Sequence, residues 1–227
     1  MKRHLTGKRL KYKSMTFIDR FSAVQLDVLK EVGNIGAGHA ATALSYLLER
    51  KIGMFVPSVQ LADFDEVVEL SGSAEEVVVS VFLKIEGDAP GGMFFILSPP
   101  QAESFVRIMT GDASFTIHNP KSMGIGVSAL KELGNILAGS YLTALSDLTQ
   151  LTLYPSVPSL NIDMAGAILS FGLLELSLVS DQGIVIETCL TDPSNETKES
   201  VEGHFFLFPD PDSYDTLFKA LGVSAYD

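Results

Sequence analysis

An internal repeat constrains this chain more than any other feature of its sequence. Shifting the 227 residues along themselves by 101 positions places the segment around Glu31 on the segment around Glu132. Two copies are too few for a solenoid, in which three or more units stack in series. The repeat therefore predicts one continuous domain with pseudo-two-fold symmetry. The matching blocks are 31–35 with 132–136, 42–45 with 143–146, and 56–58 with 157–159.

Each copy predicts the same order of elements, α-β-α-β-β-α. Apolar residues at helical spacing predict a long first helix at 24–49 and its counterpart at 130–148. Later in the chain the shift between the copies grows to 111, and a longer helix expected at 163–178 accounts for much of this insertion. The other expected helices are 65–70, 100–110 and 211–221, and the expected strands are 52–56, 59–61, 77–85, 92–97, 151–154, 160–162, 184–190 and 204–208.

The strongest strand pairs favour an α+β fold class. Strands 77–85 and 92–97, and likewise 184–190 and 204–208, are joined by loops too short to contain a crossover helix. Strands joined in this way pair antiparallel. We therefore expect an antiparallel β-sheet flanked by helices, with the phenylalanines of these strands in its core.

Composition and charge divide the chain into a short extension and a body. Residues 1–14 carry six Lys and Arg and no acid, which predicts a disordered basic extension. Residues 15–227 then form the domain, with repeat halves at about 15–118 and 119–227. That body carries ten Lys and Arg against 28 Asp and Glu, so it repels nucleic acid and anionic lipid. At 46% hydrophobic residues it can bury a core.

Several kinds of site are not supported by the sequence. The single Cys189 cannot form an intramolecular disulfide, and the four histidines show no metal-ligand spacing. The glycine-rich run 33–38 lies inside a helical pattern, whereas a phosphate-binding loop follows a strand and opens a helix. No uncharged stretch is long enough to span a membrane, and no secretory signal precedes the body. We expect a cytoplasmic chain without membrane insertion, metal or cofactor of its own.

A Glu-x-x-Asn pair occurs in the first helix of each copy. Helical positions three apart share a face, so Glu31 projects together with Asn34, and Glu132 together with Asn135. One such pair is uninformative, because many solvated helix faces carry one. Both helices keep the pair beside glycine, although Asn and Gly are poor helix formers in mid-helix. The duplication therefore indicates a functional site.

The sequence resembles the CheC/CheX/FliY family of chemotaxis response-regulator phosphatases, and within it the CheC type. The resemblance rests on these two helices, on the Val-Pro-Ser elements at 56–58 and 157–159, and on the duplicated order of elements. The resemblance covers about residues 15–227. It implies hydrolysis of the aspartyl phosphate of the response regulator CheY. It also implies a complex with the receptor deamidase CheD, and hence a monomer or a heterodimer. The implied catalytic residues are Glu31, Asn34, Glu132 and Asn135.

The implied chemistry suits a carboxamide. A phosphorylated receiver domain already holds Mg²⁺ and an acyl phosphate, so a helper protein has only to orient a water in line with phosphorus. An Asn side chain can accept a proton from that water and donate to a developing oxyanion. An exposed carboxylate is a weak base at neutral pH, so Glu31 and Glu132 suit an ion pair with the receiver's lysine better than general-base catalysis.

Two other functions remain open on the sequence alone. The first is a non-catalytic adaptor that binds phosphorylated CheY or CheD. Its expected docking surface is the start of the helix at 163–178, where Asp163 is placed as N-cap or first-turn acid, with Met164 and Ile168 following. The second is a structural protein of the flagellar switch, which would be expected to lack the Glu/Asn pairs.

Overall fold

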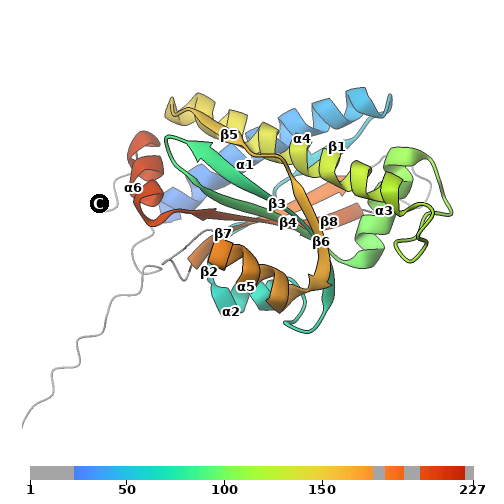
Figure 1. Cartoon of the computed structure of the whole chain (residues 1–227). Helices are drawn as coiled ribbons and strands as arrows, with labels where there is room; N and C mark the ends of the chain where they lie inside the picture. The colour runs from blue at the N-terminus through green and yellow to red at the C-terminus, as the bar shows by residue number, and fades with distance from the viewer. Residues whose placement is uncertain (1–22, 176–181, 192–199, 223–227) are drawn as a thin grey trace, which may run out of the picture.

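The computed structural model describes residues 23–175, 182–191 and 200–222, so the basic extension expected at 1–14 lies outside the described residues. The halves share one order of elements, and each proline-interrupted β segment forms two short strands (Figure 1). The first half contains α1 (Ala23–Leu47), β1 (Gly53–Phe55), β2 (Val59–Asp63), α2 (Phe64–Leu70), β3 (Val77–Gly87), β4 (Gly91–Leu97) and α3 (Pro99–Thr110). The second half contains α4 (Met123–Thr149), β5 (Leu153–Pro155), β6 (Ser159–Met164), α5 (Ala165–Glu175), β7 (Gln182–Thr191), β8 (Ser200–Pro209) and α6 (Pro211–Ala220).

The described strands form one eight-stranded sheet in the order β1-β7-β8-β4-β3-β5, with β2 also on β7 and β6 also on β3. The antiparallel pairs β3–β4 and β7–β8, expected from the short connections, are confirmed. β4 and β8 pair at the centre of the sheet, where Phe94 lies opposite Phe206 and Phe95 opposite Phe205. β1 and β2 of the first half extend β7 of the second, and β5 and β6 extend β3. The halves therefore exchange strands across a pseudo-two-fold axis.

Helices cover both faces of this sheet. The long helices α1 and α4 run antiparallel along one face, and α2 and α5 lie on the other (Figure 1). Side chains alternate along each central strand, so neighbouring phenylalanines enter different cores. Phe95 and Phe205 pack under α1 and α4, whereas Phe94 and Phe206 pack under α2 and α5. The expectation that these phenylalanines belong to the core is confirmed.

The two long helices meet at Gly36. A Cβ on this residue would lie 2.6 Å from Cδ1 of Tyr141 and 3.0 Å from its Cα, so no larger residue fits without moving a helix. Gly36 is therefore a close-packing residue of the contact between α1 and α4. Tyr141 is buried at the contact, and its hydroxyl lies 3.2 Å from the Thr188 hydroxyl. Burial raises the pKa of Tyr141 to about 12, although the hydrogen bond with Thr188 acts in the opposite direction.

α4 begins at Met123, before the expected start at 130, because its first turns pack on the segment that joins the halves. A Cβ on Gly126 would meet the buried ring of Phe115 at 2.4 Å, so this glycine lets the helix approach that segment. Local apolar spacing did not reveal the early start, because a glycine carries no apolar side chain. None of the described helices has the length and apolar character needed to cross a membrane.

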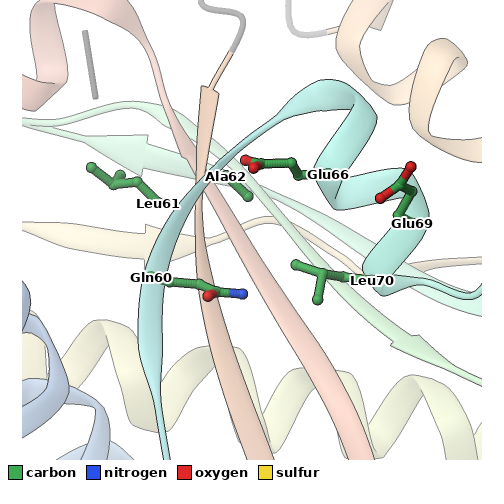
Figure 2. Close-up of a pocket in the computed structure, with 6 residues that line it drawn as sticks. All are labelled: Gln60, Leu61, Ala62, Glu66, Glu69 and Leu70. Atoms are coloured by element: carbon green, nitrogen blue, oxygen red, sulfur yellow. The ribbon is translucent and has the colours of Figure 1, made fainter. Parts of the chain in front are cut away.

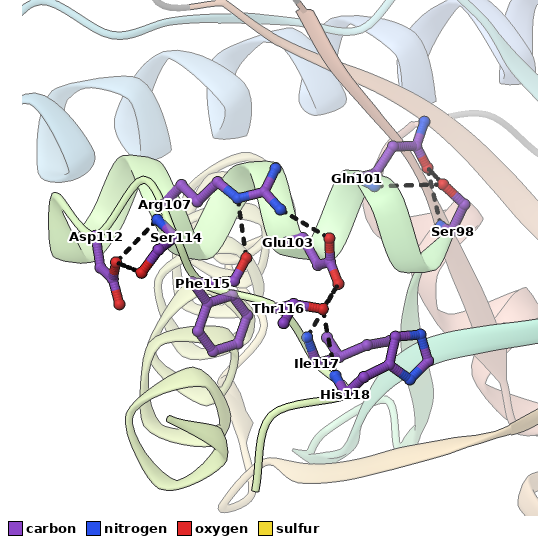
Figure 3. A network of polar contacts seen from close by, with 10 residues as sticks. All are labelled: Ser98, Gln101, Glu103, Arg107, Asp112, Ser114, Phe115, Thr116, Ile117 and His118. Carbon is purple, nitrogen blue, oxygen red and sulfur yellow. Dashed lines mark hydrogen bonds and ion pairs between the residues drawn. The ribbon is translucent and has the colours of Figure 1, made fainter. Parts of the chain in front are cut away.

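A polar network ties the joining segment to α3 (Figure 3). One oxygen of the Glu103 carboxylate accepts hydrogen bonds from the Thr116 hydroxyl at 2.6 Å and the Ile117 N–H at 3.0 Å. The other oxygen forms an ion pair with Arg107 at 2.9 Å, and Arg107 also donates to the Phe115 carbonyl at 3.0 Å. The bond from Thr116 is the largest influence that lowers the pKa of Glu103, and burial opposes it.

Proline lies at the start, and glycine at or just beyond the end, of the two helices that close the halves, which were expected at 100–110 and 211–221. α3 follows the N-cap Ser98 and ends at Gly111, whose φ of 71° is left-handed. α6 begins at Pro211, and Gly222 beyond its end has a φ of 75°. Glycine adopts this conformation without the steric cost that other residues meet.

The expected N-cap role of Asp163 is wrong. Asp163 lies in β6 opposite Val78, and α5 begins only at Ala165. The pairing of β6 with β3 continues through Asp163, so this residue is held in the extended conformation. The first N–H groups of α5 find other acceptors, since Ala165 donates to the Glu76 carbonyl at 2.8 Å and Gly166 to the Ala74 carbonyl at 3.0 Å. A side-chain cap is therefore not needed here.

Candidate functional site

Both Glu/Asn pairs lie on the outer face of the long helices, which we call the helix-pair face. On α1, Glu31 is exposed and Asn34 is half-buried. On α4, Glu132 and Asn135 are both exposed. The helical spacing predicted these shared faces, and the structure has them. Within the part of the chain that the structure describes, neither glutamate forms an ion pair, so both carboxylates are available to a cation on a partner.

The antiparallel arrangement separates the two pairs. Gly36 contacts Tyr141, and residues just after it on α1 face residues just before Tyr141 on α4. Glu31 therefore lies toward one end of the helix pair and Glu132 toward the other. The structure brings the two helices side by side without merging their polar residues into one site. We call the Glu31/Asn34 pair the first site and the Glu132/Asn135 pair the second site.

The carboxamide of Asn34 is bound within the protein. Its Oδ1 accepts a hydrogen bond from the Val56 N–H at 3.1 Å, and its Nδ2 donates to the Lys30 carbonyl at 3.1 Å. Val56 begins the first Val-Pro-Ser element and is only 2% exposed, tucked under α1 beside Gly33. The amide oxygen of the first site is thus directed toward β1 and away from the surface.

The carboxamide of Asn135 is not bound in this way. The side chain is exposed, and no hydrogen bond joins it to another of the described residues. The difference follows from the second Val-Pro-Ser element, because Val157 is 87% exposed and does not pack under its helix. Gly134, the counterpart of Gly33, packs on Val81 of β3 instead. The two copies therefore share their sequence motif but differ in the state of the asparagine.

A shallow groove of about 320 Å³ runs between the two helices beside Asn135. We call it the second-site groove. Gly139 contributes open space, since a Cβ there would meet nothing within 4 Å. An exposed histidine, His39, forms part of the α1 wall although it belongs to the other half of the chain. The lining residues are His39 and Ala43 of α1 and Asn135, Ile136, Gly139, Ser140 and Thr143 of α4.

The proximity of His39 to Asn135 was not predicted from the sequence. The two residues are far apart in the chain, and the repeat places Ser140 rather than a second histidine at the equivalent position. No local pattern reports a contact across two helices. The only signal in the sequence was Gly36, whose close approach to α4 sets the two helices against each other.

A second pocket lies on the other side of the sheet, between β2 and α2 (Figure 2). It has a volume of about 390 Å³ and is lined by Gln60, Leu61, Ala62, Glu66, Glu69 and Leu70. One of its two glutamates already has a structural role, because the Glu66 carboxylate accepts a hydrogen bond from the Asp63 N–H at 2.9 Å in the capping box that begins α2. This pocket shows no pairing of acid with base or nucleophile.

The residues expected to bind a protein partner have different environments. Asp163 and Met164 are exposed at the end of β6, Met164 by 45%. Ile168 is only 7% exposed and packs in the core under α2 and α5, so its placement on an exposed surface is wrong. The reason is the direction of α5, because the helix face that carries Ile168 packs against the sheet.

Among the described residues, no group of three or more His, Cys, Asp or Glu could hold a metal ion.

Comparisons with known proteins connect the two halves with one family. The chain matches the CheC-like family over residues 24–61 and 125–162, which contain both Glu/Asn pairs. It is 50% identical over 210 residues to the CheY-P phosphatase CheC of Bacillus subtilis (strain 168), covering 92% of this chain and 100% of that protein. It is also 28% identical over 141 residues to the flagellar motor switch phosphatase FliY of the same organism, covering 62% of this chain and 36% of that protein.

Solved structures share the fold at lower identity. The crystal structure of Thermotoga maritima FliY superposes with a TM-score of 0.69 and 20% identity, covering 89% of this chain and 98% of that one. The middle domain of FliM from H. pylori gives a TM-score of 0.60 and 12% identity, covering 88% and 99%. These similarities concern the arrangement of the chain, because a shared fold alone does not determine activity.

Proposed function

This chain belongs to the CheC-like family, and from that membership we propose that it is a phosphatase that hydrolyses the aspartyl phosphate of the response regulator CheY. One observation carries the proposal. A chain that is 50% identical over the full length of a CheY-P phosphatase also carries both Glu/Asn pairs on the helix-pair face, where Glu31, Glu132 and Asn135 are exposed and Asn34 is half-buried. A folded receiver domain can reach side chains on that face without any rearrangement of the sheet.

In this proposal the asparagine orients the attacking water. Its carboxamide oxygen accepts a hydrogen bond from a water in line with the phosphorus, and its NH₂ group donates to the phosphoryl oxygens. The bond from phosphorus to the aspartyl oxygen breaks as the water oxygen bonds to phosphorus, which gives inorganic phosphate and the free carboxylate. Orientation of the water alone can supply about 3 kcal/mol, roughly a hundredfold in rate.

The glutamate holds the receiver in place. Glu31 and Glu132 are exposed carboxylates without a cationic partner in the described part of the chain. A lysine beside the phosphoaspartate of the receiver can form the missing ion pair, and this contact fixes the register of the two proteins. Mg²⁺ arrives on the receiver in this proposal, so the phosphatase contributes no cofactor. Enzyme and substrate would meet in the cytoplasm.

The second site performs most of the hydrolysis in this proposal. Asn34 has to release the Val56 N–H and the Lys30 carbonyl before its amide can turn to a water, whereas Asn135 is exposed at the start. Two such hydrogen bonds are worth about 2 kcal/mol together, which corresponds to roughly a 30-fold lower rate. The first site then acts as a slower copy.

The test is turnover on phosphorylated CheY. Purified chain, added at one-tenth of the concentration of acyl-phosphorylated CheY, should release inorganic phosphate well above the spontaneous rate and beyond one equivalent. An outcome with tight binding but no acceleration would replace the phosphatase by a non-catalytic adaptor. CheY in which the phosphorylated aspartate is changed to asparagine is the matched control, and it should release none.

We also propose that CheD binds at the end of β6. Asp163 and Met164 are exposed there, and the exposed Val77 lies opposite Met164 in the β3–β6 pairing. The negative charge of Asp163 therefore lies beside an apolar patch formed by Met164 and Val77. Asp163→Lys should weaken the capture of CheD and leave phosphate release unchanged. Asp147→Lys, an exposed acid on α4, is the charge-matched control for binding. If Asp163→Lys captures CheD as well as the wild type does, Asp163 is not in the interface.

A further inference from the structure

The second-site groove joins residues from both halves of the chain. Its α4 wall carries Asn135, and its α1 wall carries His39. Ala43 and Gly139 also line the groove and are small, so little fills the space between the imidazole and the carboxamide. Whatever docks over Asn135 therefore also meets His39.

The imidazole is free to bind a docked protein. His39 is exposed, and no hydrogen bond or ion pair joins it to another described residue. An imidazole carries at least one N–H donor in either protonation state. The other polar groups of the groove are amide and hydroxyl groups on α4, so His39 is the polar side chain that α1 contributes.

From this geometry we infer that His39 is a substrate-contact residue of the second site, where its ring N–H donates a hydrogen bond to the phosphorylated receiver docked on Asn135. The inference rests on the proposed phosphatase function and adds a contact from the opposite helix. His39 faces Asn135 across the groove and holds the receiver, while the asparagine orients the water. Loss of His39 should therefore raise KM more than it lowers kcat.

The contact belongs to one site only. The repeat places Ser140 at the position equivalent to His39, so the α4 residue that corresponds to His39 carries a short hydroxyl and no imidazole. A serine reaches less far and cannot make the same contact. The role of His39 should then be visible only when the second site is the one in use.

Single-site backgrounds test this directly. Asn34→Ala leaves the second site, and Asn135→Ala leaves the first. In the Asn34→Ala background, His39→Ala should raise KM for phosphorylated CheY about fivefold and change kcat less than twofold, because one neutral hydrogen bond is lost. His39→Gln, which keeps an N–H donor, should restore most of the KM. In the Asn135→Ala background, His39→Ala should change neither parameter.

Thr42→Ala is the matched control. Thr42 is exposed on α1 about one turn away and lies outside the groove, and among the described residues its hydroxyl bonds only to the Gly38 carbonyl of its own helix. It should leave KM unchanged. An unchanged KM for His39→Ala in the Asn34→Ala background, or equal effects in both backgrounds, would overturn the assignment of His39. Full activity of the Asn34→Ala/Asn135→Ala double variant would instead contradict the proposed function itself, and the role of His39 with it.

Discussion

Asn34 and Asn135 are the same residue in the same motif, yet their surroundings give them different chemistry. Helical spacing was enough to predict that each shares a face with a glutamate. The hydrogen bond from Val56 to Asn34 was beyond the sequence, because it depends on where β1 runs beneath α1. Val157 occupies the equivalent position in the second copy and is exposed, so the second asparagine remains open.

Single asparagine variants should therefore be unequal. We expect Asn135→Ala to remove more than nine-tenths of the phosphate release, because the remaining Asn34 must first leave two hydrogen bonds. Asn34→Ala should keep most of the activity. The measurement is kcat/KM for phosphorylated CheY with each variant. Equal losses would show that the bonds to Val56 and Lys30 do not restrain the first site.

At the scale of elements, the contact between α1 and α4 depends on a glycine. We expect Gly36→Ala to lower the free energy of unfolding by about 1–3 kcal/mol, because its Cβ would approach the Tyr141 backbone. Gly38→Ala is the control, since a Cβ there would meet nothing within 4 Å. It should stabilise the helix by about 0.5–1 kcal/mol. Urea unfolding of both variants measures these changes in the free energy of unfolding. An unchanged free energy of unfolding for Gly36→Ala would mean that the helices are not in close contact.

The segment between the halves should depend on the charge of Glu103. Its lowered pKa means that its contribution to stability is fully present above the ordinary value of 4.5 and is lost as the pH falls through the lower folded value. Glu103→Gln should cost about 1–2 kcal/mol at pH 7, because the ion pair with Arg107 and the charged character of the bonds from Thr116 and Ile117 are lost.

Unfolding of wild type and Glu103→Gln at several pH values gives the measurement. The difference between the two proteins should shrink as the pH falls below 4.5 and then through the lowered pKa of Glu103 in the folded protein, where its carboxylate takes up a proton. A constant difference from pH 7 to pH 3 would contradict the ionic role of Glu103. Ser114→Ala is a useful comparison, because its hydroxyl bonds to Asp112 and not to Glu103.

Elements were predicted best where local chemistry determines them. Proline starts, glycine stops and short connections between strands gave the end helices and the antiparallel pairs. Asp163 shows where prediction from local sequence fails. An acid before a helical pattern is a good N-cap only if the chain leaves the sheet at that residue. Pairing of β6 with β3 keeps Asp163 in a strand, and the carbonyls of Glu76 and Ala74 serve the helix instead.

At the scale of the whole molecule, strand exchange ties the halves together. The repeat predicted a pseudo-two-fold body, but the exchange of β1 and β2 for β5 and β6 could not be read from the sequence, because long-range strand partners leave no local pattern. A fragment of residues 15–118 would expose the edge that β5 and β6 cover, and its β1 and β2 would lack β7. Each half thus depends on the other for its sheet.

Separated halves should therefore not fold alone. We expect fragments 15–118 and 119–227 to lack cooperative thermal unfolding by circular dichroism, because each loses strand partners and half of the shared core. An equimolar mixture should regain a cooperative transition, which controls for damage to the fragments. A fragment that melts cooperatively by itself would show that the halves are independent domains.

Phosphate release by the Asn34→Ala/Asn135→Ala double variant tests the role of the two asparagines most directly. The variant is first matched to the wild type in thermal unfolding, so that any loss reports chemistry and not folding. We expect hydrolysis of phosphorylated CheY to fall to the spontaneous rate, while the receiver still binds through Glu31 and Glu132. Phosphate release at the wild-type rate from the folded double variant would contradict this role.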